Sequence, residues 1–242
     1  NINDTNEIFD YGPDKIITVN KEDIKIFNAK IYADIIYQIA KKNSANYVIL
    51  GGGVDSKFLA PILSIKLNAG YLSNVVELPS NFEPFTVKRT SFSNKSFCDA
   101  SIYSENKIIS LSSNSYEKMK IPSNPQIIEF DVEIPNSTIK QDSIETAKGN
   151  ISIADADIVV SAGRGMKGPE NWHLIENLAN TLNAATACSK PVSDLGWRPH
   201  SEHVGQTGKP VATNLYIAIG ISGAIQHLAG VSSSKVKVVI NN

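Results

Sequence analysis

In the C-terminal part of the chain, an apolar run, a glycine turn and an amphipathic segment follow one another in a recurring order. The apolar run 156–161 leads into the glycine-rich stretch 163–168 and then into 170–182, where leucine and isoleucine recur at helical spacing. A second apolar run covers 215–220. Such an alternation is typical of parallel strands joined by crossover helices, so we expect a doubly wound parallel sheet. Its remaining elements are expected at 184–187, 223–228 and 235–240.

The N-terminal part also alternates between strand and helix signals, as a three-layer α/β domain does. A helix is expected at 29–42, followed by a buried strand at 47–50 and a second helix at 58–67 that ends at an Asn-Ala-Gly stop signal. The stretch 73–111 changes to short alternating runs separated by proline, asparagine and serine, which predicts a meander of antiparallel or mixed strands. Strands in this part are expected at 15–19, 74–78, 85–92 and 107–111.

A polar stretch separates the two parts. Residues 112–150 contain several prolines and charges and little periodicity, which predicts a linker with one strand at 127–132. The domains expected from this division are an N-terminal α/β domain at 1–130, a linker at 131–150 and a C-terminal domain at 151–242.

The charge balance argues against two classes of partner. The chain has 23 basic and 24 acidic side chains among 242 residues, a formal net charge of −1. Nucleic-acid binders and polybasic membrane proteins need an excess of positive charge, and no apolar run approaches the ~18 residues of a membrane helix. We therefore expect neither nucleic-acid binding nor membrane insertion. Cys98 and Cys188 lie in no metal-binding spacing, which favours a reducing compartment.

The stretch 163–168 satisfies the dinucleotide pattern G-x-G-x-x-G between a strand and a helix. The ordinary fingerprint also needs an acidic residue after the next strand, to hold a ribose, but 187–190 reads Ala-Cys-Ser-Lys. Three interpretations stay open: an NAD(H)-binding enzyme module of Rossmann type, a plain tight turn, and a variant loop that contacts another cofactor.

A second glycine cluster, 220–227, places Ser222 between an apolar strand and a helix. The first-turn N–H groups, the serine hydroxyl and the helix dipole would converge on one point, so the pattern predicts an anion site. It does not match a G-x-S-x-G nucleophile elbow, because Gly223 follows the serine directly. The alternative is a glycine turn that only fixes the geometry between strand and helix.

The turn 205–210 is rich in hydrogen-bond donors. It is not a P-loop, because Pro210 stands where that motif needs serine or threonine. The Gln206 amide and the Thr207 hydroxyl could bond a heteroaromatic ring. The preceding His200 and His203 lie close enough in sequence to suggest a metal site, but no third ligand follows at a suitable spacing, so a solvated loop is the preferred interpretation.

Taken together, the stretches 160–165, 204–209 and 215–230 resemble the alpha subunit of electron transfer flavoproteins. The resemblance is dense over 156–241 and looser over 14–111. It implies an electron carrier rather than a substrate-transforming enzyme, with one FAD bound in the C-terminal domain. It also implies a partner beta subunit that carries AMP.

The resemblance assigns the flavin site residue by residue. Residues 204–207 would line the ring, with Thr207 donating toward N5, and 222–226 would hold the diphosphate and ribityl chain. His227 would reach the N1/O2 edge and Asn241 would lie by the adenosine half. The full expected set is Arg164, Ser189, Lys190, Val204, Gly205, Gln206, Thr207, Ser222, Gly223, Ala224, Ile225, Gln226, His227 and Asn241.

The resemblance further implies the cellular setting. Electrons would arrive from flavin dehydrogenases of fatty-acid or amino-acid oxidation, such as acyl-CoA dehydrogenases, and leave to a membrane quinone oxidoreductase. The compartment would be the cytoplasm in a bacterium or the mitochondrial matrix in a eukaryote. Two departures stand out: Lys190 replaces a frequent arginine, and family members extend further at both ends, so the FAD-binding domain is expected to be incomplete at its C-terminal end.

Overall fold

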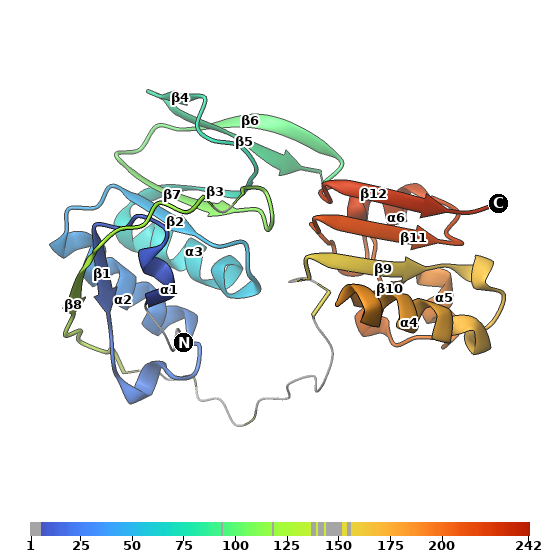
Figure 1. The fold of residues 1–242 in the computed structure, drawn as a ribbon. Helices are drawn as coiled ribbons and strands as arrows, with labels where there is room; N and C mark the ends of the chain where they lie inside the picture. Colours follow the sequence, from blue (N-terminus) through green and yellow to red (C-terminus); the bar gives the residue numbers. More distant parts are fainter. Residues whose placement is uncertain are drawn as a thin grey trace. The chain divides into compact units, whose positions relative to one another are not determined.

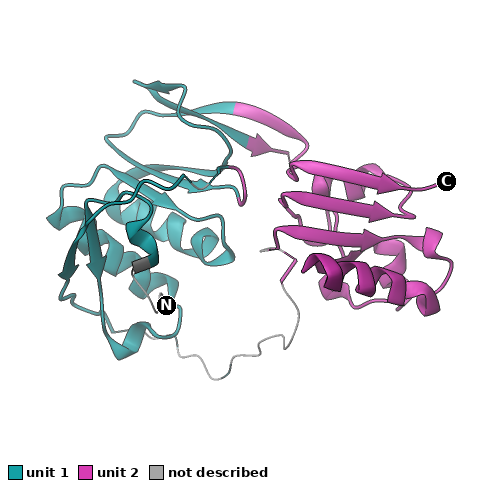
Figure 2. Ribbon diagram, in the orientation of Figure 1, with its two compact units in different colours: residues 1–89, 99–112, 116–143 teal, residues 90–98, 113–115, 144–242 magenta. Residues whose placement is uncertain are grey.

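The structure is a computed structural model, and it describes residues 6–92, 94–117, 119–136, 139, 143, 152–153 and 156–242. The chain divides into two units (Figure 2). Unit 1 consists of residues 1–89, 99–112 and 116–143, and unit 2 of residues 90–98, 113–115 and 144–242.

Unit 2 is built on four parallel strands in the order β10-β9-β11-β12 (Figure 1). The chain runs from β9 outward to β10 and then crosses back to β11, so the direction of winding reverses between β9 and β11. Such a reversal leaves a crevice at the carboxyl ends of the two strands. The strands are β9 (Ile158–Ala162), β10 (Ala185–Cys188), β11 (Leu215–Ile219) and β12 (Val236–Ile240).

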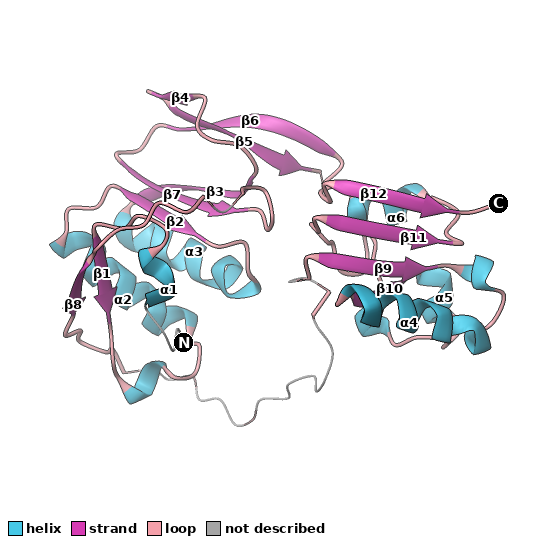
Figure 3. Ribbon diagram, in the orientation of Figure 1, coloured by secondary structure: helices cyan, strands magenta, loops and turns pink. Residues whose placement is uncertain are grey.

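Helices bury both faces of this sheet (Figure 3). One face packs Val160 and Ile217 against Trp172 and Ile175 of α4, and the opposite face packs Tyr216 with a cluster that includes the end of α6. Burial on both faces explains why these strands have apolar runs instead of a simple alternation. The helices are α4 (Trp172–Leu182), α5 (Lys190–Asp194) and α6 (Ile225–Val231).

The ends of these helices follow from local sequence. Asn183 ends α4 in the left-handed region with φ 50°, a conformation that asparagine tolerates. The helix predicted to begin at residue 223 begins only at Ile225. Gly223 has φ +72°, which lies outside the right-handed helical region, so it cannot be part of the helix.

Most of a mixed sheet in the order β2-β7-β3-β5-β4, with β6 paired to β5, belongs to unit 1. The pairs β2–β7 and β7–β3 are parallel, and β3–β5 and β5–β4 are antiparallel. The helices α2 (Ala29–Lys42) and α3 (Val54–Leu67) share a core with this sheet around Ala33, Leu63 and Ile108. The strands are β2 (Tyr47–Leu50), β3 (Ala69–Val75), β4 (Asn81–Phe82), β5 (Phe85–Ser91), β6 (Ser96–Ile102) and β7 (Asn106–Leu111).

The polar stretch after residue 112 is more than a linker. It carries β8 (Gln126–Glu129), which pairs in parallel with β1 (Lys15–Thr18) in a separate two-stranded sheet. Phe130 and Val132 follow β8 and are buried against Ile31 and Ile35 of α2. The strand predicted at 127–132 is therefore present in shortened form, and its apolar residues complete a core of unit 1.

The predicted fold class is confirmed: both parts of the chain are α/β, and the C-terminal part holds a doubly wound parallel sheet. Three details of the predicted meander are wrong. Strand β3 begins at Ala69 rather than at residue 74, and β4 and β6 were not predicted. Most residues of β6 are polar or exposed, so no regular apolar alternation marks it. The part of the chain that the structure describes contains no helix long and apolar enough to cross a membrane.

Candidate functional site

The carboxyl ends of the unit 2 strands surround a cavity of about 630 Å³. Each strand delivers residues to it: Arg164 follows β9, Ser189 follows β10, Ser222 follows β11 and Asn241 follows β12. Most of the residues predicted for the flavin site line this one cavity. They are Arg164, Ser189, Lys190, Val204, Gly205, Gln206, Thr207, Ser222, Ala224, Gln226, His227 and Asn241.

Two predicted site residues do not line this carboxyl-edge cavity. Ile225 is 65% exposed at the start of α6, and Gly223 lies in the turn before it. The positive φ of Gly223, +72°, gives this glycine a part in shaping the turn.

The turn between β11 and α6 offers free backbone donors. The N–H groups of residues 221–226 donate no hydrogen bond to any residue that the structure describes. Gly220 and Gly223 flank Ser222 with φ +61° and +72°, and left-handed residues of this kind turn successive N–H groups toward a common concave side. The anion site predicted at Ser222 therefore has the required donors, supplied by the turn more than by the short helix.

The G-x-G-x-x-G stretch serves a different purpose from its usual one. The N–H of Gly163 donates to Ile219 O at 2.9 Å, and the N–H of Gly165 donates to Gly220 O at 3.0 Å. A Cβ on Gly165 would lie 2.5 Å from the Cα of Gly220. These glycines let two backbones touch, and both amides are already paired. The amides of Gly163 and Gly165 are therefore not free to bind a dinucleotide diphosphate, which weakens the NAD(H) alternative.

The donor loop 203–209 packs against α6. The N–H of Gln206 donates to Gln226 O at 2.8 Å, which joins the loop to the helix. A Cβ on Gly230 would lie 2.6 Å from the Cα of Gly205, so this contact also needs glycine. The loop and the turn that precedes α6 thus form adjacent walls of the cavity.

A partly buried ion-pair network of Arg198, Glu202 and Glu176 holds the start of this loop. Arg198 donates to Glu202 at 2.6 and 2.8 Å and to Glu176 of α4 at 2.8 Å. The hydrogen bond to Glu202 raises the pKa of Arg198 above its usual value. The guanidinium also lies 5.6 Å from the Trp172 ring centroid. The solvated loop predicted around 200–203 is therefore wrong, because Glu202 and His203 are buried.

His227 lies in a dry environment on α6. Its Nε2 is 2.9 Å from the hydroxyl of Tyr216 in β11, and both residues are buried. Its Nδ1 is also buried and has no hydrogen-bond partner among the described residues. Burial lowers the pKa of His227 to about 4, so the imidazole is neutral at neutral pH.

Burial favours the neutral forms of two further titratable groups, His203 in the cavity lining and Cys188 beside it. Burial raises the pKa of Cys188 to about 12, which keeps it as an unreactive thiol. Burial and the nearby Lys190 lower the pKa of His203. No group of three or more His, Cys, Asp or Glu side chains among the residues described could hold a metal ion.

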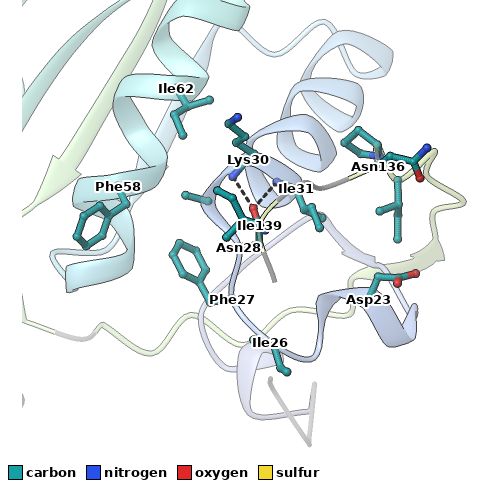
Figure 4. A pocket seen from close by; sticks show the side chains of 13 residues that line it. Asp23, Ile26, Phe27, Asn28, Lys30, Ile31, Phe58, Ile62, Asn136 and Ile139 are labelled. Carbon is teal, nitrogen blue, oxygen red and sulfur yellow. Dashed lines mark hydrogen bonds between the residues drawn. The ribbon is translucent and has the colours of Figure 1, made fainter. Parts of the chain in front are cut away.

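A larger hollow of about 800 Å³ lies in unit 1 at the start of α2 (Figure 4). Its walls are largely apolar and include Phe27 and Phe58. The side chain of Asn28 accepts hydrogen bonds from the N–H groups of Lys30 and Ile31, at 3.0 and 3.3 Å. The helix cap therefore already satisfies these two donors at the start of α2.

Sequence reasoning missed two groups near the site. The four-residue spacing of Arg198 and Glu202 suits an ion pair on a helical turn and could have been noticed. Tyr216 stands inside an apolar strand, where a buried hydroxyl normally needs a partner. That partner, His227, could be identified only once the packing of α6 was known.

Comparison with known proteins gives matches over both halves of the chain. Residues 152–232 match the family described as "Electron transfer flavoprotein FAD-binding domain", and residues 3–135 match "Electron transfer flavoprotein domain". "Electron transfer flavoprotein subunit alpha" of Bacillus subtilis is 31% identical, over 97% of this chain and 73% of its own length. The "Probable electron transfer flavoprotein subunit alpha, mitochondrial" of Caenorhabditis elegans is 33% identical, over 95% of this chain and 69% of its own length.

Proposed function

Because the chain belongs to the electron transfer flavoprotein family, as a relative of its alpha subunits, we propose that it holds FAD in the carboxyl-edge cavity of unit 2 and acts as half of a heterodimeric electron carrier. FAD is the cofactor of the domain matched at 152–232. The observation that carries the proposal is the convergence of the predicted flavin residues on one cavity.

The residues present fit this cofactor. The free N–H groups of 221–226 suit the two phosphates of a dinucleotide, and the exposed Lys190 adds a positive charge at the same cavity. Gln206 and Thr207 offer side-chain donors and acceptors to a heteroaromatic ring. Asn241 lines the same cavity, and its side-chain amide could bond the adenosine half of the cofactor.

A bound flavin would supply electron-transfer chemistry, and the chain would supply binding and electrostatics. The turn at 221–226 would hold the phosphates, and the loop 204–207 would orient the ring. The neutral imidazole of His227 would present one N–H without adding a charge. We therefore assign the chain a carrier role in which no substrate bond is made or broken.

The proposal extends to partners. A beta subunit that carries AMP would complete the heterodimer. Flavin dehydrogenases such as acyl-CoA dehydrogenases, acting in fatty-acid or amino-acid oxidation, would donate electrons, and a membrane quinone oxidoreductase would accept them. The near-neutral net charge of −1 suits protein partners better than nucleic acid. The proposed compartment is the cytoplasm of a bacterium or the mitochondrial matrix of a eukaryote.

The test is purification of the chain with its beta subunit, followed by a visible absorption spectrum and extraction of the bound cofactor. We expect one FAD per heterodimer. A folded heterodimer without flavin absorbance, even after incubation with excess FAD, would overturn the proposal. Titration with NADH under the same conditions serves as the control, and tight binding of NADH alone would favour the nicotinamide alternative.

A further inference from the structure

The donor loop 203–209 packs against the side chain of its own first residue, His203. We propose that His203 is a positioning residue whose imidazole holds the tip of the loop, Gln206 and Thr207, at the carboxyl-edge cavity. The consequence for a bound flavin rests on the proposed function, whereas the order of the loop itself does not.

The loop closes on itself through backbone hydrogen bonds. The N–H of Lys209 donates to His203 O at 2.8 Å, and the N–H of Gly208 donates to Gly205 O at 3.1 Å. These bonds bring the two ends of the loop together. The two tip residues are exposed and line the cavity, so a ligand would meet them wherever the loop holds them.

The imidazole of His203 lies against both glycines that flank the tip. A Cβ on Gly208 would lie 2.8 Å from Cγ and Nδ1 of the ring, and a Cβ on Gly205 would lie 3.3 Å from Nε2. The ring therefore reaches from one side of the tip to the other. Glycine leaves room for it at both positions, because a larger residue at either would press on the ring.

The backbone of His203 directs its side chain toward the loop. His203 is extended, with φ −70° and ψ 120°, and the next residue, Val204, is fully buried in the core cluster that includes Tyr216. Successive side chains of an extended chain point to opposite sides, so His203 points away from that core. It is nevertheless only 7% exposed, which agrees with cover by the loop.

The charge state of the ring suits this packing. Burial and the positive charge of Lys190 lower the pKa of His203, and Asp194 opposes them only in part. The imidazole is therefore neutral at neutral pH. No buried charge opposes its close contact with the two glycines.

Without the ring, the tip would lose one of its supports. Its backbone is also joined to α6, where the N–H of Gln206 donates to Gln226 O at 2.8 Å. An exposed segment with few buried contacts opens locally at a low cost in free energy. A tip that is in place for only part of the time binds its ligand with a correspondingly lower affinity.

The experiment is amide hydrogen exchange, followed by NMR, on the full chain without flavin. His203→Ala should speed exchange of the Lys209 N–H by at least roughly tenfold, because the buried ring is lost while the carbonyl that accepts this bond remains. His203→Phe keeps a flat ring without nitrogens and should exchange near the wild-type rate. His173→Ala, at an exposed position of α4, is the matched control.

Spectra of the wild type test the geometry directly. We expect nuclear Overhauser contacts between the ring protons of His203 and the Hα protons of Gly205 and Gly208. Their absence would overturn the inference even if His203→Ala does not fold. Unchanged exchange in a folded His203→Ala chain, or equally fast exchange in His203→Phe, would overturn it as well.

Flavin binding by the heterodimer tests the consequence. His203→Ala should lower the affinity for FAD, and His203→Phe should retain it. Lost affinity in His203→Phe with a protected loop would show that the ring nitrogens bind the flavin, which overturns the positioning role. Unchanged affinity in His203→Ala despite faster exchange would overturn it too. Failure of the wild-type heterodimer to bind flavin would refute the proposed function and leave the exchange result standing.

Discussion

A Cβ on Gly230 would lie 2.6 Å from the Cα of Gly205, so α6 touches the donor loop through two glycines. This contact holds the loop against α6, although Gly205 and Gly230 are 25 positions apart in the sequence. The cavity depends on this close approach, because each of its two walls comes from one of these segments.

Gly230→Ala should therefore weaken unit 2. The added methyl meets backbone atoms that cannot turn aside, and overpacking of this kind costs about 1–3 kcal/mol. Urea unfolding followed by tryptophan fluorescence reports this unit, because Trp172 and Trp197 both belong to it. Gly51→Ala is the control, since nothing lies within 4 Å of its Cβ position. Equal midpoints for Gly230→Ala and Gly51→Ala would contradict the packing argument.

Arg198→Ala should destabilise unit 2, because it leaves Glu202 buried without its partner. The expected loss is about 1–3 kcal/mol. Arg198→Lys should recover little of this loss, since lysine lacks the fork that reaches two carboxylates. Asn214→Ala, which removes an exposed 3.2 Å hydrogen bond to Asp157, is the control in the same unit. Full recovery by lysine would show that charge alone matters.

The stability of unit 2 should fall as the pH drops from about 6.5 to about 4. His227 has its pKa lowered to about 4 in the folded chain, and the ordinary value is about 6.5. Between these values the unfolded chain binds more protons, so acid favours unfolding. The loss approaches roughly 3 kcal/mol at the low end.

Carboxylates also titrate in this range, so the difference between two pH profiles is the quantity to measure. His227→Gln should have a flatter profile than the wild type, and His173→Gln, at an exposed position of α4, should not. Parallel profiles for the wild type and His227→Gln would mean that His227 titrates normally in the folded chain.

Ser222→Asp should lower the affinity of the heterodimer for FAD by at least roughly tenfold, equivalent to about 1.4 kcal/mol. The new carboxylate would stand among the free amides of 221–226, where the phosphates are proposed to bind. Flavin retention on dialysis, with tryptophan fluorescence as a check of folding, measures the effect. Ser233→Asp adds the same charge outside the cavity lining and should retain flavin. Equal retention by both variants would place the phosphates elsewhere.

Periodicity and turn signals predicted the elements that are buried and regular. Helix α2 and strand β2 lie at the predicted 29–42 and 47–50. Apolar residues at helical spacing are buried together only in a helix, and the short apolar run 47–50 matches a buried strand. Strand β6 escaped prediction, because its residues are largely polar or exposed and pairing with β5 alone fixes it. The burial of Phe130 was also not predicted, since it depends on α2, which is far away in sequence.

The site was predicted mainly through its resemblance to a family, and the structure adds physical reasons. The free amides around Ser222 follow from the positive φ angles of Gly220 and Gly223. Glycine permits this conformation, but the sequence alone does not establish it. The G-x-G-x-x-G motif was ambiguous in sequence, because one pattern serves both phosphate binding and backbone contact. Only the paired amides of Gly163 and Gly165 distinguish the two.

The pairing of β1 with β8 also matters for biosynthesis. Lys21 and Asp131, just beyond the two strands, form an ion pair at 2.6 Å across 110 residues of sequence. During synthesis on the ribosome, Ile16 is made long before its partner Ile127. The backbone groups of β1 that pair with β8 therefore stay unpaired while most of unit 1 is synthesised. An open strand edge invites pairing with other chains. Strand β1 is thus a part of the nascent chain that needs shielding until residue 129 has emerged.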